Sequence, residues 1–244
     1  MRVLTAADGE VLGLGFSPAG DALAAAVSDR GVFLWNLAAG SATPVRLDTT
    51  ASPYRNRHLF FAPDGRWFRG WSVSTKEMPV HDLAVSPDGG RMALLVRETR
   101  STRLSDFPIR LELRSAADGR REKTGPYPYS YASPLTFSPD GGQLVAVCAM
   151  TLLVWPVPGL GEPRGVRNDT RKHFTAAAYH PSGRYLFATS NDATVHVFDA
   201  AGWERVGRFT WNVGRLRSVA VSPDGSLAAA GGDKGEVVVW DVDL

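Results

Sequence analysis

The residue types that perform catalysis are present in this chain but do not form any known catalytic pattern. The five histidines stand in separate segments, and the single cysteine lies within an apolar run. The sequence has no His-Glu-x-x-His, no cysteine pair, no Gly-x-Ser-x-Gly and no phosphate-binding glycine loop. We therefore expect a protein that is not an enzyme and holds no cofactor. The enzymatic alternative is a metal bound by residues that are distant in the sequence.

Arginine supplies the other chemistry that the sequence offers. Among the 27 basic residues only four are lysines, namely Lys76, Lys123, Lys172 and Lys234. A planar guanidinium can bind a carboxylate or phosphate through two parallel hydrogen bonds, whereas a lysine acts as a point charge. The bias indicates either recognition of acidic groups or the base composition of the gene, and the sequence leaves both open. The net charge of +2 is too small to predict nucleic-acid binding by itself.

Six similar turns divide the chain into repeats. Each turn has an apolar or aromatic residue, one further residue, a proline and, two positions later, a glycine; the turns begin at Phe16, Phe61, Val85, Phe137, Tyr179 and Val221. Three of the five steps between them are 42 to 45 residues long, which is typical of a four-stranded propeller blade. The sequence therefore predicts an all-β protein in which residues 1–244 form one β-propeller domain of four-stranded antiparallel blades.

The last repeat shows how such a blade is built. Residues 216–221, 227–230 and 236–242 are apolar segments separated by turn signals, and they predict three strands. Residues 2–5 stand before the strand expected at 11–16, in the place where other repeats carry the fourth strand of the preceding blade. We expect this N-terminal strand to pair beside residues 237–239 and to close the ring, leaving no open sheet edge there.

The step of 24 residues between the second and third turns is too short for a blade. Residues 58–62 and 66–72 predict two strands, so we expect six blades, one of them incomplete. The next step is 52 residues long and contains an arginine-rich insertion at 97–107 and a third strand at 109–113. We expect the additional residues to cover the incomplete blade; a strand from a partner protein is the alternative.

The ends of the predicted third strands resemble the WD40-repeat β-propeller family. Trp240-Asp241 matches the terminal dipeptide of that repeat, while Trp35-Asn36, Trp155-Pro156 and Phe198-Asp199 are degenerate versions, as in bacterial-type members. The chain departs from the family in lacking a Gly-His pair before each turn. The hydrogen-bond network that links histidine to tryptophan in the family is therefore in doubt here, and we expect packing to carry more of each blade's stability.

The resemblance also implies where a partner binds. In the family, the loops entering first strands and the loops joining second to third strands share one face, and function usually concentrates there. On this face the resemblance places the following basic and aromatic residues as the predicted partner-binding site: Tyr54, Arg55, Arg57, Arg100, Tyr127, Tyr129, Arg171, Lys172, Trp211 and Arg215. Two alternatives stay open, because residues 125–129 can be a stiff connector whose rings pack on a neighbouring blade, and Trp211 can fill the space of the absent histidine.

We expect a non-catalytic protein-interaction scaffold, a monomer that binds another protein or an acidic or phosphorylated peptide. Nucleic-acid binding by the basic face is disfavoured because 25 acidic residues almost balance 27 basic ones. The N-terminal residues lack an apolar signal segment, which favours the cytoplasm. The apolar residues 144–161 are interrupted by Pro156 and Pro158, so we expect two strands there, no membrane span, and a buried Cys148.

Overall fold

The computed structural model consists of β-strands joined by turns and loops. It describes residues 2–6, 8–17, 19–27, 31–38, 43–47, 59–61, 67–69, 74–75, 78–97, 109–115, 120–129 and 134–243. Within these ranges there is no helix, which confirms the predicted all-β class. The chain divides into two compact units, unit 1 with residues 1–70 and 175–244 and unit 2 with residues 71–174. A single domain over residues 1–244 stays a prediction.

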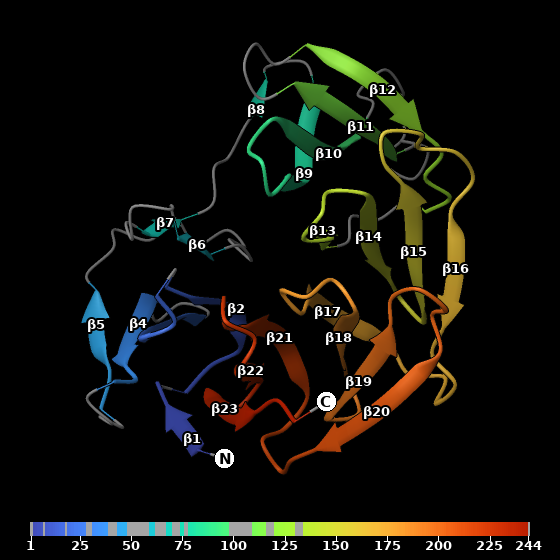
Figure 1. Cartoon of the computed structure of the whole chain (residues 1–244). Coiled ribbons are helices and arrows are strands. Elements are labelled where there is room, and N and C mark those ends of the chain that lie inside the picture. The colour runs from blue at the N-terminus through green and yellow to red at the C-terminus, as the bar shows by residue number, and fades with distance from the viewer. Residues whose placement is uncertain are drawn as a thin grey trace, which may run out of the picture. The chain divides into compact units, whose positions relative to one another are not determined.

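Unit 1 contains three four-stranded antiparallel sheets in its described part (Figure 1). The first sheet has the order β2 (Val11–Phe16), β3 (Ala22–Val27), β4 (Gly31–Asn36) and β5 (Val45–Leu47). The second has β17 (Phe174–Tyr179), β18 (Tyr185–Ser190), β19 (Thr194–Asp199) and β20 (Arg205–Thr210). The third has β1 (Arg2–Thr5), β23 (Glu236–Asp241), β22 (Leu227–Gly232) and β21 (Leu216–Val221).

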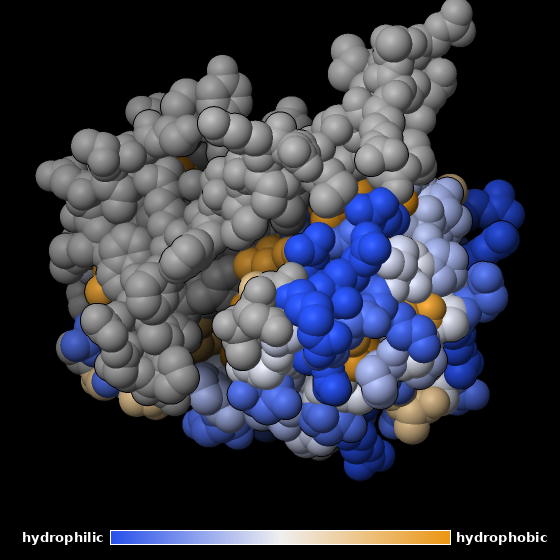
Figure 2. All heavy atoms as spheres, turned by 90° about the horizontal axis from the view of Figure 1, so that it is seen from above, coloured by the Kyte–Doolittle hydropathy of each residue, from blue (hydrophilic) through white to orange (hydrophobic). Residues whose placement is uncertain are grey.

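Unit 2 contains one sheet of five strands and one of four in its described part. The larger has the order β12 (Arg121–Gly125), β11 (Ile109–Ser115), β10 (Arg91–Arg97), β9 (Met78–Val85) and β8 (Ser74–Thr75). The smaller has β13 (Leu135–Phe137), β14 (Gln143–Cys148), β15 (Thr151–Pro156) and β16 (Arg164–Arg167). Seen from above, hydrophilic side chains gather on the side of β12 and β16 (Figure 2). The predicted third strand at 109–113 is confirmed as part of β11.

The N-terminal strand β1 completes the C-terminal sheet, as predicted. It pairs antiparallel with β23 in a register that places Arg2 opposite Val239 and Thr5 opposite Glu236. The side chain of Leu4 is 3% exposed and lies in one apolar cluster with Val237 and Val239. Both ends of the chain therefore contribute to one sheet and to one core.

The incomplete blade is described only in part. β6 (Leu59–Phe61) and β7 (Trp67–Arg69) form a two-stranded antiparallel sheet, which confirms the two strands predicted at 58–62 and 66–72. The arginine-rich insertion at 97–107 lies almost wholly outside the described residues, so the way in which the short blade is covered stays a prediction. The number of blades stays a prediction for the same reason.

The Ser-Pro-Asp-Gly turns between first and second strands have one recurring geometry. In the turn after β13, Asp140 Oδ1 accepts hydrogen bonds from the Ser138 hydroxyl (2.5 Å) and from the Gly142 amide (2.9 Å). Gly141 has φ +69°, a conformation that a side chain disfavours. The aspartates of these turns are therefore explained by local hydrogen bonding, as the sequence predicts.

The apolar stretch at 144–161 contains the two predicted strands. β14 and β15 run antiparallel around a turn at residues 149–150, with Cys148 opposite Thr151, and Cys148 is fully buried. No helix in the described part of the chain is long and apolar enough to cross a membrane.

The tryptophans at the ends of third strands are held by packing. The indole Nε1 atoms of Trp35, Trp155 and Trp240 are buried and have no hydrogen-bond acceptor among the described residues. Each ring lies in an apolar cluster, and none is more than 4% exposed. The expected packing is therefore present at these three positions, and each unsatisfied donor costs about 1–3 kcal/mol.

Candidate binding surface

Trp211 anchors the loop between β20 and β21 in unit 1. Its ring lies 4.5 Å from the ring of Trp240 and stacks at 5.8 Å and 9° on Phe209. Trp211 itself is half-buried, so part of the ring is left open to solvent. The ring thus packs on the core near the buried Trp240, and its position is fixed by aromatic contacts on two sides.

Arg215 lies in the same loop, which is braced by Asp233 from the loop between β22 and β23. The Arg215 amide donates to Asp233 Oδ1 (2.9 Å), and the Asp233 amide donates to the Arg215 carbonyl (2.9 Å). A Cβ at Gly214 would clash with Asp233 Oδ1, and φ at Gly214 is +77°, so this position requires glycine. The side chain of Arg215 is exposed, and the structure therefore brings Trp211 and Arg215 together on one rigid loop.

Arg171 and Lys172 lie in a second ordered loop, which follows β16 in unit 2. The buried side chain of Asn168 organises it, because its Oδ1 accepts from the Thr170 amide (3.1 Å) and its Nδ2 donates to the Lys172 carbonyl (2.9 Å). Arg171 has φ +58°, and both basic side chains are exposed. The backbone is fixed while the charged groups project into solvent.

Tyr127 and Tyr129 pack on the core of unit 2. The Tyr127 ring stacks at 6.3 Å on Trp155, and its hydroxyl lies 3.5 Å from Cys148 Sγ. Tyr129 meets the Tyr127 ring edge-on at 6.2 Å, and both residues are half-buried. These contacts agree with the alternative that residues 125–129 form a connector whose rings pack on the core. That Tyr127 and Tyr129 also bind a partner stays a prediction.

The remaining predicted site residues, Tyr54, Arg55, Arg57 and Arg100, lie outside the described residues. The described loops around Trp211 are of mixed charge. Glu10, in the loop before β2, pairs with Arg217 (3.1 Å), and Ala6 in the same loop donates its amide to the carbonyl of Gly235. The acidic residues Asp8, Glu10 and Asp233 and the basic residues Arg215 and Lys234 therefore lie in the loops at one end of the sheet formed by β1, β23, β22 and β21.

Sequence reasoning missed a buried carboxylate on β11. Glu112 is fully buried and accepts hydrogen bonds from Arg110 Nε (2.7 Å) and Arg114 Nε (2.8 Å), with Arg121 of β12 3.4 Å away. Burial by itself raises the pKa of Glu112, but the hydrogen bonds and charges of Arg114 and Arg110 outweigh it and hold the pKa below its ordinary value. The spacing of two residues in Arg110-x-Glu112-x-Arg114 was the available signal, because it places all three side chains on one face of a strand.

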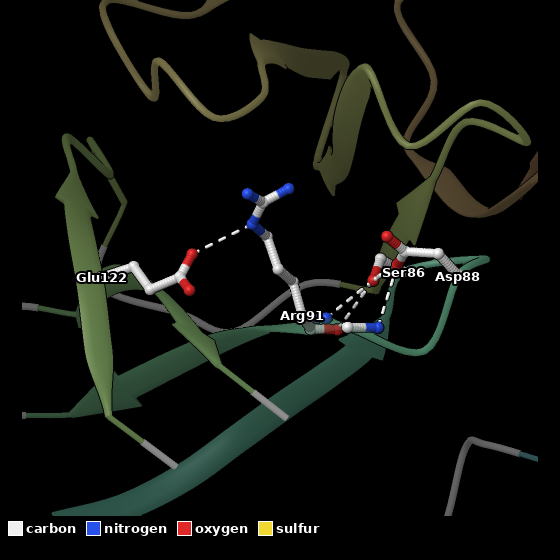
Figure 3. A network of polar contacts seen from close by, with 5 residues as sticks. Ser86, Asp88, Arg91 and Glu122 are labelled. Carbon is white, nitrogen blue, oxygen red and sulfur yellow. Dashed lines mark hydrogen bonds and ion pairs between the residues drawn. The ribbon is translucent and has the colours of Figure 1, made fainter. Parts of the chain in front are cut away.

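A second polar network joins the turn after β9 to β12 (Figure 3). The Arg91 amide donates to the Ser86 hydroxyl (2.8 Å), and its guanidinium pairs with Glu122 at 3.0 Å. Asp88 accepts from Ser86 and from the Gly90 amide, and the Ser86 hydrogen bond is the main cause of its lowered pKa. The Arg91–Glu122 pair is exposed, unlike Glu112, so it is screened by solvent.

Among the described residues, no three histidine, cysteine or carboxylate side chains are placed to hold a metal ion.

Three segments match the sequence model of the family described as WD domain, G-beta repeat: residues 1–36, 166–199 and 203–241. These three segments carry WD40 repeats. The last match begins just before β20 and continues through β21, β22 and β23, and the first begins with β1 and continues through β4. Each matched segment therefore begins at the end strand of one sheet and continues through the first three strands of the next. In the first match β1 is this end strand, and the sheet it belongs to is the C-terminal one.

One curated relative is the small ribosomal subunit protein RACK1 of Caenorhabditis elegans. It is 39% identical over 69 residues, which is 23% of this chain and 20% of the relative. The chain thus matches about a fifth of the length of that protein.

Proposed function

We propose that the protein is a non-catalytic scaffold that binds another protein through the loops carrying Trp211, Arg215, Arg171 and Lys172. WD40 repeats and similarity to RACK1 favour protein interaction in general. The loop architecture carries the proposal further. Trp211 and Arg215 project from a loop that Asp233 and the Trp240 ring hold in place, so little conformational entropy is lost when a partner binds.

The chemistry of these side chains favours an acidic or phosphorylated segment of the partner. Arg171, Lys172 and Arg215 are exposed cations on braced backbones, and a guanidinium binds carboxylate or phosphate oxygens in pairs. The partly open ring of Trp211 offers rigid apolar area, a feature enriched in the energetic centres of protein interfaces. In unit 1 the Asp233 carboxylate contacts the Arg215 amide, so a long acidic segment on this loop would meet it, and this favours a short one.

The proposal is tested by affinity capture from a lysate of the source cells, followed by mass spectrometry. The variant carries Arg55→Glu, Arg171→Glu and Arg215→Glu, and it is expected to lose the partner while its thermal midpoint stays near wild type. Arg171 and Arg215 are exposed, and substitutions at such positions change stability by about 0.5 kcal/mol or less.

The matched control carries Arg120→Glu, Arg164→Glu and Arg205→Glu, which change the net charge equally at exposed positions outside the two loops. Equal retention of the same proteins by the loop variant and by wild type would contradict the proposal. Equal loss from both variants would show that net charge, and not the loop surface, determines capture.

A further inference from the structure

The turn between β14 and β15 and the loop after β16 form one surface of unit 2. The Asn168 amide donates to the Met150 carbonyl (2.8 Å). The Phe174 amide donates to the Ala149 carbonyl (2.7 Å). Both ends of the loop at residues 168–174 are therefore attached to the two residues of the turn.

Cations stand on both sides of Met150 in this arrangement. Arg167, the last residue of β16, is opposite Thr151 on β15, the residue that follows Met150. Lys172 lies at the other end of the loop, close to Phe174, which is bonded to the residue that precedes Met150. The backbone pairing thus places one basic residue on each side of the turn.

Met150 is an apolar residue in a turn that is polar or small elsewhere in the chain. It is 44% exposed. The corresponding turns are Asn191-Asp192-Ala193 between β18 and β19 and Asp233-Lys234-Gly235 between β22 and β23. The hydrogen bond of Met150 to the loop uses its carbonyl, which any residue supplies, so the side chain itself is exposed to a ligand.

The basic side chains around Met150 are exposed and carry uncompensated charge. In the described part of the chain, the side chains of Arg167, Arg171 and Lys172 make no hydrogen bond or ion pair. The one acidic residue between 167 and 173 is Asp169, which interacts with other groups. Three cations and one carboxylate give this segment a formal charge of +2.

The backbone of the loop is fixed before any ligand binds. Asn168 is 4% exposed, and its Nδ2 donates to the Lys172 carbonyl (2.9 Å). Arg171 has φ +58°, a conformation that glycine adopts without strain and that costs another residue about 1–2 kcal/mol. Strained residues of this kind cluster at ligand-binding sites, where the surrounding structure holds them in place.

We call Met150, Arg167, Arg171 and Lys172 the Met150 surface. We propose that it binds an acidic segment of a partner protein in which carboxylates flank a central apolar side chain. The apolar side chain packs on Met150, whose thioether adapts to irregular shapes, and the carboxylates pair with Arg167 on one side and Lys172 on the other. This role rests on the scaffold function and specifies its ligand in unit 2.

The test is fluorescence anisotropy of the fluorescein-labelled peptide Gly-Ser-Asp-Glu-Leu-Glu-Asp-Ser-Gly, titrated with the full chain. A second peptide has serine in place of the leucine and the same charge. We expect wild type to bind the leucine peptide about fivefold more tightly, because its side chain leaves water on Met150. The titration is made at physiological salt, where exposed charges more than about 8 Å apart are largely screened.

Met150→Ser isolates the apolar contact. It keeps the carbonyl that holds the loop, so it should bind the serine peptide as wild type does and lose the preference for leucine. The comparison of two peptides on two proteins separates this pairwise contact from any general change in affinity.

Arg167→Glu with Lys172→Glu isolates the charges and should weaken the binding of both peptides about tenfold or more, because carboxylates then face carboxylates. The matched control is Lys123→Glu with Lys234→Glu, two exposed residues outside the Met150 surface that change the net charge equally. The control should bind both peptides as wild type does.

Four results would overturn the assignment of this ligand. Two are absence of leucine-peptide binding by wild type and an equal preference for leucine in wild type and Met150→Ser. The third is equal weakening by the charge variant and its control, which would reduce the effect to net charge. The fourth is tighter binding of a peptide with phosphoserine in place of the leucine, which would assign the cations to a phosphate. Each of these results leaves the scaffold function in place, because capture of a partner from the lysate tests that function separately.

Discussion

At the scale of single residues, the repeat is defined by a short network of hydrogen bonds in its turn. In the last turn, Asp224 Oδ1 accepts from the Ser222 hydroxyl (2.6 Å) and from the Ser226 amide (3.0 Å), while Oδ2 accepts from the Ser226 hydroxyl (2.8 Å). The neighbouring turn contributes as well, because His180 Nε2 lies 3.2 Å from the Gly225 carbonyl. The Ser182 amide donates to His180 Nδ1, so Nε2 carries the proton and donates to that carbonyl.

These bonds make the turn sensitive to pH. The Ser222 hydrogen bond, followed by those from Ser226, lowers the pKa of Asp224 from its ordinary value of 3.8 to about 2. Because the folded-state pKa is the lower one, the carboxylate stabilises the fold above about pH 4, and this contribution is lost as pH falls towards 2. We expect the thermal midpoint of Asp224→Asn to lie below wild type at pH 5 and to converge with it near pH 2, measured by scanning calorimetry.

Ser222→Ala provides the second variant for this measurement. It removes the strongest cause of the low pKa, so the loss of stability should begin at a higher pH than in wild type. A difference between Asp224→Asn and wild type that is constant from pH 5 to pH 2 would show that the carboxylate's charge does not contribute.

At the scale of elements, β11 shows how a strand accommodates a charge in its interior. Glu112 is fully buried between Arg110 and Arg114, whose side chains are 24% and 25% exposed. The opposite face of the same strand places Leu111 and Leu113 in the apolar core of unit 2. One strand therefore contributes an apolar face to the core and an ionic cluster to the other side of the sheet.

The cluster should be much more important for stability than the exposed pair beside it. Glu112→Gln keeps the shape but removes the charge that two arginines share, and we expect it to lower the free energy of unfolding by about 2 kcal/mol or more. Glu122→Gln is the control on the neighbouring strand, and loss of its exposed pair with Arg91 should cost less than about 1 kcal/mol. Urea unfolding measures both, and equal losses would contradict the assignment.

The sequence predicted elements where apolar pattern and turn chemistry agree. β21, β22 and β23 follow from runs of small and branched residues bounded by Pro-Asp-Gly and Asp-Lys-Gly turns. The ionic cluster was missed because the third partner, Arg121, comes from β12, and only strand pairing shows which residues lie opposite one another. Trp211 and Arg215 were predicted site residues, but residue types do not reveal their brace, in which the Asp233 side chain accepts from the Arg215 backbone amide.

At the scale of the whole molecule, the closure depends on strand order, because β1 pairs with β23 from the other end of the chain. The closure was predictable because each sequence repeat begins with the fourth strand of the preceding sheet. Residues 2–5 stand in that position before the first repeat, and the preceding sheet is the C-terminal one.

A disulfide across the closure tests it directly. Thr5 and Glu236 are opposite each other in the β1–β23 register, and such pairs in antiparallel sheets lie within the range that a disulfide spans. We expect Thr5→Cys with Glu236→Cys to form a cross-link under mild oxidation, while Cys148 stays reduced because it is fully buried. The bond joins the two ends of the chain and should stabilise the protein by about 2–4 kcal/mol, since it restricts the unfolded chain most when the enclosed loop is long. Urea unfolding with and without reductant measures the gain, and failure of the two thiols to cross-link would place β1 elsewhere.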